Sequence, residues 1–503
     1  MNGRGRCPAG LEKHGEDVGR KAARGSVWTG LSSYAVFAIS FATGIVLARA
    51  IDPAVFGVFA FATAIVGLIR IIGGIGYPDF LIRRGELEAG TVGTVFSVSL
   101  LLGAGVIVLW VAVSPLLYFF AAPELVWLTG ILALVAAAGF AAEVPLALMQ
   151  RTFALKSIAV IQLVSGVVVC ATSLLIVFLG GGIAALVVQG AGTTLLSGAL
   201  YFAVTPERIG LRWDRAVVRE LFHKGKSFFG SGIVMTMSRQ LDKLMIGAFL
   251  TDAQLGFYNR AQRMSGLFSV VVPTAVTRTV LPTYSAVKGD RGKLIFTYDL
   301  LMSMHLLLLG PLGVGLIFGG EALIELLYGA KWVPSAPAFR IFVLVLVLTP
   351  LVGIGNLLHI ALNHPERMAR ASLAAFTVFL PALWVGLSRW GIVGAAGAVA
   401  LFEIAGFTVV TAYTAAVLGT RVTLRPLLPH VACVLVSVPL LSWMTHVLGG
   451  RGLGLVAELA VVGIATIVIY GGVLALLDRK RVAASIGYVL EKLGVSRGRP
   501  MKA

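Results

Sequence analysis

The sequence predicts an all-α polytopic membrane protein with fourteen transmembrane helices, built as two pseudo-repeated six-helix lobes around a central cavity plus two extra helices. Composition is the first reason. Of 503 residues, 58% are hydrophobic and 13% are charged, and the mean hydropathy is +0.93. A soluble protein usually carries about twice that charged fraction. Apolar runs of about 20 residues recur along the chain, which is the length that a helix needs to cross a bilayer. The third reason is an internal repeat.

The first lobe is expected over residues 26–204, after an N-terminal tail (1–25) that lacks the apolar core of a cleaved signal peptide. Asp52 and Pro53 suit the cap and the first turn of its second helix. The polar segment 205–226 follows, with apolar residues spaced for an amphipathic helix on the cytoplasmic membrane surface. The six spans of this lobe are predicted at 26–48, 54–78, 94–119, 125–149, 158–179 and 183–204.

The second lobe is expected over residues 227–418, and two further spans lie within 419–477, outside the repeat. The C-terminal tail, 478–503, has apolar residues on one helical face and basic residues around them, which predicts a cytoplasmic surface helix. The spans of this half are predicted at 227–250, 255–275, 296–318, 339–362, 372–387, 393–418, 427–448 and 453–477.

The formal net charge of +18 is explained by topology. Lys and Arg lie mostly in loops and tails between apolar spans, so membrane lipids are the expected partners of these charges and nucleic acid is not. The basic loops follow the even-numbered spans, which places both termini in the cytoplasm. An odd number of spans would place one basic tail outside, so fourteen is favoured.

The repeat begins where residues 47–62 align with residues 246–261 without a gap, so that Gly57 falls on Gly256. Two shorter correspondences follow in the same order. Because the repeated unit has an even number of spans, both copies insert with the same orientation, as in transporters with parallel repeats. Two such bundles are expected to form a cleft near the membrane midplane and to work by alternating access.

Cationic side chains lie inside several predicted spans, where each costs roughly 2.5–3.5 kcal/mol on insertion scales and is a functional candidate by default. Arg239 and Lys243 share one helix face with Asp242, either toward a cavity or as a neutralised ion-pair cluster. Arg70 either faces a cavity or pairs with a carboxylate such as that of Glu143. The remaining cations are Arg260 and Arg263, which face a cavity or snorkel to the outer interface, and Arg278.

Acidic residues and a glycine-rich break complete the candidate site. A carboxyl group inside a membrane can exchange a proton, hold Na⁺ or pair with an arginine. The candidates are Glu143, Asp242, Asp299 and Glu403. A hinge is predicted at the end of span 2, at Gly73, Gly74, Gly76 and Pro78. No P-loop, HExxH, GxSxG or paired-cysteine motif is found, so the sequence predicts no enzyme, no cofactor and no metal site, and leaves coupling to H⁺ or Na⁺ open.

Four stretches carry a family resemblance: Trp28-Thr-Gly30, GIVLARAIDPAVFGVFAFA (44–62), IGYPDFLIRR (75–84) and DKLMIGAFLTDAQLGFYNRAQRM (242–264). Together they resemble the polysaccharide transporter family, the Wzx-type O-antigen and exopolysaccharide flippases of the multidrug/oligosaccharidyl-lipid/polysaccharide superfamily. The resemblance covers about residues 20–420.

The resemblance implies export of undecaprenyl-diphosphate-linked oligosaccharides, for lipopolysaccharide O-antigen or exopolysaccharide, from the inner to the outer leaflet. Arginine binds diphosphate in bidentate geometry, so the six intramembrane cations become candidates for the diphosphate and glycan. The implied partners are the lipid-linked oligosaccharide and the polymerase and glycosyltransferases of the same pathway. The alternatives are a peptidoglycan lipid-precursor flippase and a multidrug/cation antiporter of the same superfamily. A membrane glycosyltransferase or polymerase is less favoured, because it would need a large carboxylate-bearing loop.

Overall fold

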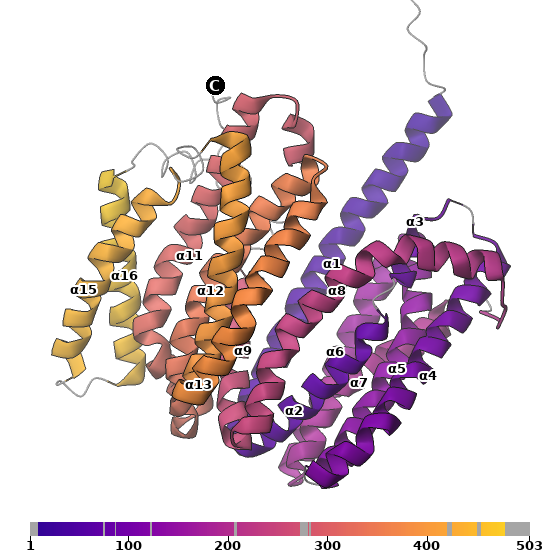
Figure 1. The fold of residues 1–503 in the computed structure, drawn as a ribbon, viewed down its shortest axis with the longest axis horizontal. Helices are drawn as coiled ribbons and strands as arrows, with labels where there is room; N and C mark the ends of the chain where they lie inside the picture. The colour runs from indigo at the N-terminus through magenta and orange to yellow at the C-terminus, as the bar shows by residue number, and fades with distance from the viewer. Residues whose placement is uncertain are drawn as a thin grey trace, which may run out of the picture. The chain divides into compact units, whose positions relative to one another are not determined.

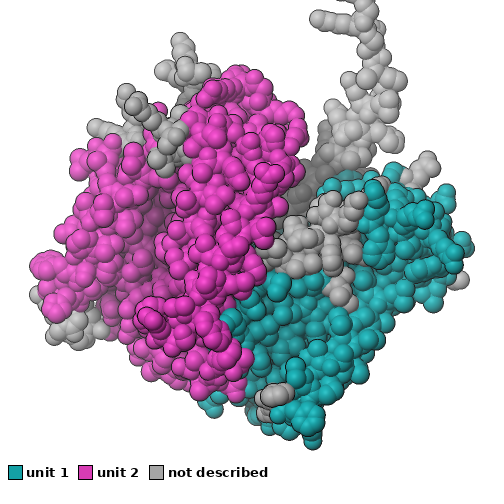
Figure 2. Space-filling view, in the orientation of Figure 1, with its two compact units in different colours: residues 1–247 teal, residues 248–503 magenta. Residues whose placement is uncertain are grey.

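The computed structural model describes residues 9–73, 76–85, 87–120, 123–205, 209–271, 280, 283–419, 425–449 and 454–477. Every regular element within these ranges is a helix (Figure 1). The chain divides into two compact units, residues 1–247 and residues 248–503, which Figure 2 shows in teal and magenta. The predicted all-α membrane fold is confirmed.

The described residues of unit 1 form α1 (Ala9–Ala50), α2 (Pro53–Ile69), the 3₁₀ turn η1 (Arg70–Gly73), α3 (Tyr77–Arg83), α4 (Ala89–Phe120), α5 (Pro123–Arg151), α6 (Leu155–Phe178), α7 (Gly182–Val204) and most of α8 (Arg215–Phe249). Small residues bring these helices close together. A Cβ at Gly103 of α4 would lie 2.9 Å from the carbonyl oxygen of Ala137 in α5, so no larger residue fits there without a shift. At Gly190 of α7, a Cβ would lie 2.8 Å from the ring of Phe59 in α2.

The predicted break at the end of span 2 is present. Helix α2 tightens into η1, and Gly76 then adopts a positive φ of 67° that directs the chain into α3. Pro78 follows in the first turn of α3, a position that suits its missing N–H. A Cβ at Gly73 would overlap the ring of Phe140, so the break also lets α5 approach. Gly74 lies outside the described residues, and hinge motion at this break stays a prediction.

The linker before α8 is attached to unit 1. Its extended residues lie along α4, where Ser97 Oγ donates to the carbonyl oxygen of Arg212 at 2.9 Å and the Asp214 N–H donates to Thr94 Oγ1 at 3.1 Å. Glu220 in α8 pairs with Arg84 at 3.2 Å. Among the apolar residues expected on one face of a membrane-surface helix, Val217 and Leu221 are buried, whereas Leu211, Trp213 and Phe222 are exposed. The amphipathic surface helix stays a prediction.

The far end of α8 packs against α2 within unit 1. A Cβ at Gly67 of α2 would lie 2.9 Å from the side chain of Gln240, and a Cβ at Gly247 would overlap the ring of Phe61. The compact unit therefore extends to residue 247, whereas the sequence placed the boundary between lobes within 205–226. The six-helix lobes and the other predicted segment limits stay a prediction.

Unit 2 contains α9 (Asp252–Val271), α11 (Arg291–Tyr328), the 3₁₀ turn η2 (Ala330–Ser335), α12 (Ala336–Ala361), α13 (Pro365–Leu418), α15 (Leu428–Gly449) and α16 (Leu455–Leu477). Helix α13 is a hairpin of two helices that meet at Gly391, whose φ of 56° and ψ of −134° are not helical. Its halves run antiparallel, since Phe379 meets Phe402 edge-to-face with ring centroids 5.8 Å apart and Gly386 meets Gly394. The hairpin therefore accounts for predicted spans 11 and 12.

Ten helices among the described residues are long and apolar enough to cross a membrane. One of them is the α13 hairpin, which holds two expected spans. Expected spans 2, 7 and 8 fall on α2, α8 and α9, which are shorter or carry more charge. The structure agrees with fourteen spans, and the number itself stays a prediction.

Helices α15 and α16 dock on α11 through one buried tyrosine. The Tyr470 hydroxyl of α16 occupies the space beside Gly310 of α11 that a Cβ would fill. The same hydroxyl lies 2.9 Å from Nδ1 of His430 in α15, and Cys433 Sγ lies 3.6 Å from the Tyr470 carbonyl oxygen. A glycine thus creates the socket, and the hydrogen bond satisfies the polar atom inside it.

We expect Gly310→Ala to lower the free energy of unfolding by about 1–3 kcal/mol, the usual cost of overpacking a filled core. Gly315→Ala is the matched control on the same helix, because its Cβ would meet Thr466 at an ordinary 3.6 Å. Thermal unfolding of both variants in detergent checks this. Equal melting temperatures for the two variants would contradict the claim that the Tyr470 hydroxyl needs the space beside Gly310.

Candidate functional site

A charged and aromatic group surrounds the break in unit 1. Arg70 begins η1, and its Nη2 lies 3.8 Å from Oε1 of Glu143 in α5. Its guanidinium also lies over the ring of Phe140, 5.5 Å from the centroid. Tyr77, fully buried at the start of α3, places its hydroxyl 2.6 Å from Oε2 of Glu143 and 2.9 Å from the carbonyl oxygen of Phe140. The carboxylate thus has a cation on one oxygen and a hydroxyl donor on the other.

The geometry of this group leaves the cation accessible. The side chains of Arg70 and Glu143 are 44% and 36% exposed, so neither is enclosed by protein. Two alternatives had been open for Arg70, a cavity role or pairing with Glu143, and the structure shows the pair. At 3.8 Å this pair is loose, and the planar guanidinium keeps N–H donors for another acceptor. Arg70 can therefore bind a second anion without first losing a tight partner.

The second predicted cluster lies on α8, also in unit 1. Asp242 is buried with a side-chain exposure of 1%, and Lys243 Nζ lies 4.0 Å from its Oδ1. Lys243 also donates from Nζ to the carbonyl oxygen of Arg239 at 2.7 Å, so its ammonium folds back onto its own helix. Arg239 itself is exposed. The shared helix face is present, and of its two cations Arg239 is the more accessible.

Arg260 in unit 2 lies in an aromatic cage. Its guanidinium lies 4.9 Å from the ring centroid of Tyr328 at the end of α11 and 5.2 Å from that of Trp332 in η2. Arg260 is buried, with 6% of its surface exposed. Cation–π contacts and desolvated packing of this kind hold a guanidinium in place. Arg263, one turn along α9, is exposed and leaves its charge accessible.

The remaining predicted residues are spread over unit 2. Asp299 is half-buried on α11 beside Tyr298, and Glu403 is half-buried in the second half of the α13 hairpin. Arg278 lies outside the described residues. The coupling role of these acidic groups stays a prediction.

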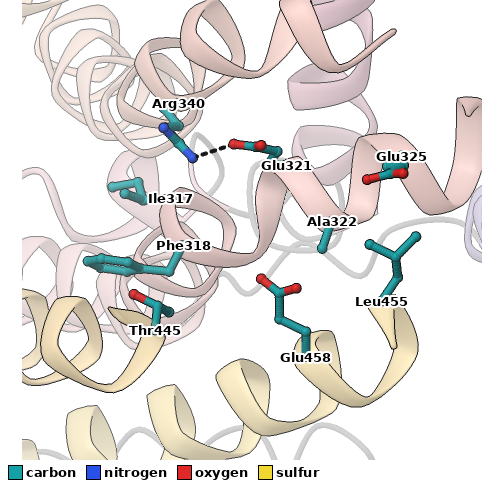
Figure 3. Close-up of a pocket in the computed structure, with 9 residues that line it drawn as sticks. All are labelled: Ile317, Phe318, Glu321, Ala322, Glu325, Arg340, Thr445, Leu455 and Glu458. Atoms are coloured by element: carbon teal, nitrogen blue, oxygen red, sulfur yellow. Dashed lines mark hydrogen bonds and ion pairs between the residues drawn. The ribbon is translucent and has the colours of Figure 1, made fainter. Parts of the chain in front are cut away.

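A cavity of about 440 Å³ in unit 2 is lined by four charged side chains, those of Glu321, Glu325, Arg340 and Glu458. Figure 3 shows Arg340 of α12 paired with Glu321 of α11 at 2.9 Å, while Glu458 reaches from α16 toward α11. Glu325 lies on the cavity wall one turn beyond Glu321. The sequence alone does not reveal this cavity, because its lining residues come from four helices that only folding brings together.

These observations define a multi-pass membrane protein whose bundles hold accessible arginines. A family model described as polysaccharide biosynthesis protein matches residues 46–337, which is more than half of the chain. The chain therefore belongs to this family of polysaccharide biosynthesis proteins.

Individual relatives agree with this assignment. The chain is 28% identical to the succinoglycan biosynthesis transport protein ExoT of Rhizobium meliloti over 323 residues, covering 63% of this chain and 64% of that one. It is 24% identical to the lipopolysaccharide biosynthesis protein WzxC of Escherichia coli over 381 residues, 74% and 77% of the two chains. The chain thus spans less than two thirds of the length of the first of these relatives.

Among solved structures, the fold is similar to that of the lipid II flippase MurJ in an inward closed conformation. The TM-score is 0.68 at 14% identity, with 91% of this chain and 100% of that chain covered. At this identity the likeness concerns the fold alone.

We expect Arg260→Lys to lower the free energy of unfolding by about 1–2 kcal/mol, because an ammonium cannot stack flat between two aromatic rings in a dry cage. Arg263→Lys, at an exposed position one turn away, is the control and should unfold like the wild type. Thermal unfolding in detergent measures both. An unchanged melting temperature for Arg260→Lys would argue against the cage.

Proposed function

We propose that this protein is a flippase that moves lipid-linked oligosaccharide repeat units, carried on undecaprenyl diphosphate, across the bacterial cytoplasmic membrane by alternating access. The observation that carries the proposal is Arg70, a guanidinium that is 44% exposed yet lies at a helix break inside an apolar bundle. Membership of the polysaccharide biosynthesis family supports this proposal, as do its relatives, a succinoglycan biosynthesis transport protein and a lipopolysaccharide biosynthesis protein.

The chemistry of such a substrate fits this arginine. A lipid diphosphate brings two negative phosphates into a region where water is scarce, so transfer needs a fixed cation that replaces hydration. A guanidinium meets phosphate oxygens with two parallel N–H bonds. Glu143 competes for the same guanidinium from 3.8 Å, and this competition limits how tightly the diphosphate is held. A transporter needs that limit, because the substrate must also leave.

The distribution of basic residues along the chain supports an orientation in the membrane. The basic loops support a cytoplasmic location for both termini and a bacterial inner membrane as the site of action. The proposed partners are the glycosyltransferases that build the lipid-linked unit and the polymerase that uses it. The proposed transport needs no catalytic group and no cofactor, and coupling to H⁺ or Na⁺ is part of the proposal.

One alternative has an observation in its favour. The fold resembles the lipid II flippase MurJ over 91% of this chain, so a peptidoglycan precursor is the second candidate substrate. Rescue of a strain depleted of its peptidoglycan flippase would support that reading. Failure to rescue, together with loss of surface polysaccharide on deletion of the gene, would favour the first.

We expect Arg70→Ala to reduce transport strongly. Loss of a charge-assisted bond worth about 1.5–3 kcal/mol weakens diphosphate binding roughly tenfold to a hundredfold. The measurement is translocation of a fluorescent undecaprenyl-diphosphate oligosaccharide in liposomes, with surface polysaccharide in a complemented deletion strain as a second readout. Lys293→Ala, a loop cation 72% exposed, is the control and should transport normally. Full activity of Arg70→Ala would remove Arg70 from the site.

Glu143→Gln should separate binding from turnover. Gln can still accept from the Tyr77 hydroxyl, but it no longer neutralises Arg70, so the diphosphate should bind up to about fivefold tighter, the value of a partly exposed ion pair. Release should slow, and transport should fall. Binding of the lipid diphosphate to detergent-solubilised protein and translocation in liposomes measure the two effects. Unchanged affinity would show that Glu143 does not compete.

A further inference from the structure

The Glu143 carboxylate is held by the hydroxyl of Tyr77. The hydroxyl oxygen lies 2.6 Å from Glu143 Oε2 and 2.9 Å from the carbonyl oxygen of Phe140. A phenol keeps its proton at neutral pH, so the hydroxyl has one proton to donate to these two acceptors. Hydrogen bonds from a hydroxyl to an ionised oxygen are about 2.5–2.7 Å long, and the shorter contact falls in this range. Glu143 is therefore the main acceptor.

The hydroxyl contact outweighs the contact with Arg70. Arg70 Nη2 lies 3.8 Å from Glu143 Oε1, and both side chains are partly exposed. An exposed ion pair of this kind shifts an equilibrium by at most about fivefold, whereas a hydrogen bond to a charged acceptor shifts it roughly tenfold to a hundredfold. The position of the carboxylate is therefore determined mainly by Tyr77 and only weakly by Arg70.

Tyr77 is itself fixed on α5. It is fully buried, and its ring lies edge-on to that of Phe140, with centroids 6.4 Å apart. Near the other end of α3, Arg151 of α5 donates from Nη1 to the carbonyl oxygen of Leu81 at 3.1 Å and from Nη2 to that of Gly85 at 2.6 Å. Helix α3 is thus attached to α5 at both ends, so the hydroxyl is a fixed point for the carboxylate.

The contact with Tyr77 leaves Glu143 in the wrong geometry for a tight ion pair. A bidentate pair needs both carboxylate oxygens about 2.7–2.9 Å from two guanidinium nitrogens. Here Oε2 faces the Tyr77 hydroxyl, and Oε1 lies 3.8 Å from Arg70. The guanidinium meanwhile lies over the Phe140 ring. Arg70 therefore keeps donors for another anion because the carboxylate beside it is held by a third group.

We propose that Tyr77 is a positioning residue for transport. By holding Glu143, it prevents the carboxylate from pairing tightly with Arg70 and keeps the guanidinium available to the diphosphate of the lipid-linked substrate. The role in transport rests on the proposed function, whereas the effect of Tyr77 on the Arg70–Glu143 pair does not. Without the hydroxyl, the carboxylate can turn both oxygens toward the cation that it already faces. The diphosphate would then have to displace a tight partner.

The first test measures the Arg70–Glu143 pair without reference to transport. Phenylglyoxal modifies free guanidinium groups, and tight pairing with a carboxylate protects them. In Tyr77→Phe, which loses one oxygen and keeps the ring, labelling of Arg70 in the purified protein should slow severalfold, as measured by mass spectrometry. Tyr284→Phe is the matched control in unit 2, because Tyr284 is fully buried and its hydroxyl has no hydrogen-bond partner among the described residues. Unchanged or faster labelling of Arg70 in Tyr77→Phe overturns the proposal.

The second test measures binding of undecaprenyl diphosphate to the detergent-solubilised protein. Tyr77→Phe should bind it about fivefold more weakly, because the tightened carboxylate competes for Arg70. The double variant Tyr77→Phe/Glu143→Gln should bind as tightly as Glu143→Gln alone, since Tyr77 then has no carboxylate to hold away from the cation. A purely structural role for Tyr77 would leave the double variant as weak as Tyr77→Phe, and that result overturns the proposal.

Glu143→Gln gives a measurement that does not depend on the folding of Tyr77→Phe. Because the wild-type pair is loose, removal of the charge should speed labelling of Arg70 by no more than about fivefold. A larger increase would show that the pair is already tight when Tyr77 is present, and would overturn the proposal. Melting temperatures of the purified variants show whether weaker binding reflects lost structure.

The outcomes separate the two proposals. A wild-type protein that neither binds undecaprenyl diphosphate nor translocates the lipid-linked oligosaccharide defeats the proposed function, while labelling of Arg70 still decides whether Tyr77 loosens the pair. Slower labelling in Tyr77→Phe with an unchanged affinity for undecaprenyl diphosphate defeats the positioning role.

Discussion

The absence of water inside a bilayer is the constraint on which this structure depends. A backbone group that finds no hydrogen-bond partner there costs several kcal/mol, so a chain that crosses many times must do so as helices. The same constraint acts on polar side chains. The hydroxyl of buried Tyr470 meets His430, and the buried guanidinium of Arg260 lies over two aromatic rings. Among the described residues, some buried side-chain atoms have no hydrogen-bond partner, such as the Tyr284 hydroxyl and Nε2 of His305.

Close helix contact in lipid depends on shape, since lipid tails are as apolar as the side chains they would replace. The chain meets this requirement by pairing a glycine on one helix with a ring on another. Gly310 receives the Tyr470 hydroxyl, and Gly73 receives the ring of Phe140. The second pair has a functional consequence, because it brings α5, and with it Glu143, against the turn that carries Arg70. The contact between Gly73 and Phe140 therefore explains both the close packing at the break and the position of Glu143 beside Arg70.

The sequence was sufficient for the fold class and for most spans, because apolar runs, prolines and basic loops are local signals. It predicted the break at Gly73–Pro78 and placed spans 11 and 12 on either side of Gly391. It could not decide whether Arg70 pairs with Glu143, since the two residues lie far apart in the chain. The cage around Arg260 was missed for the same reason, because Tyr328 and Trp332 come from α11 and η2, which only folding brings beside α9. The extension of unit 1 to residue 247 likewise depends on contacts between α2 and α8.

The distribution of accessible cations changes the expectation for substrate binding. The predicted lobe boundaries place Arg239 and Lys243 in the second lobe and Arg70 in the first. In the structure, Arg239 and Lys243 belong to the compact unit that also holds Arg70, while Arg260 of the second unit is enclosed by aromatic rings. A guanidinium already held by two rings has little to gain from a phosphate, because binding would first have to break those contacts. Arg70 has a loose carboxylate and one aromatic ring to exchange, so the cost of switching partners is smaller there. Under the proposed function, binding of the diphosphate should therefore depend more on Arg70 than on Arg260, and Arg263 is one of the exposed cations of unit 2.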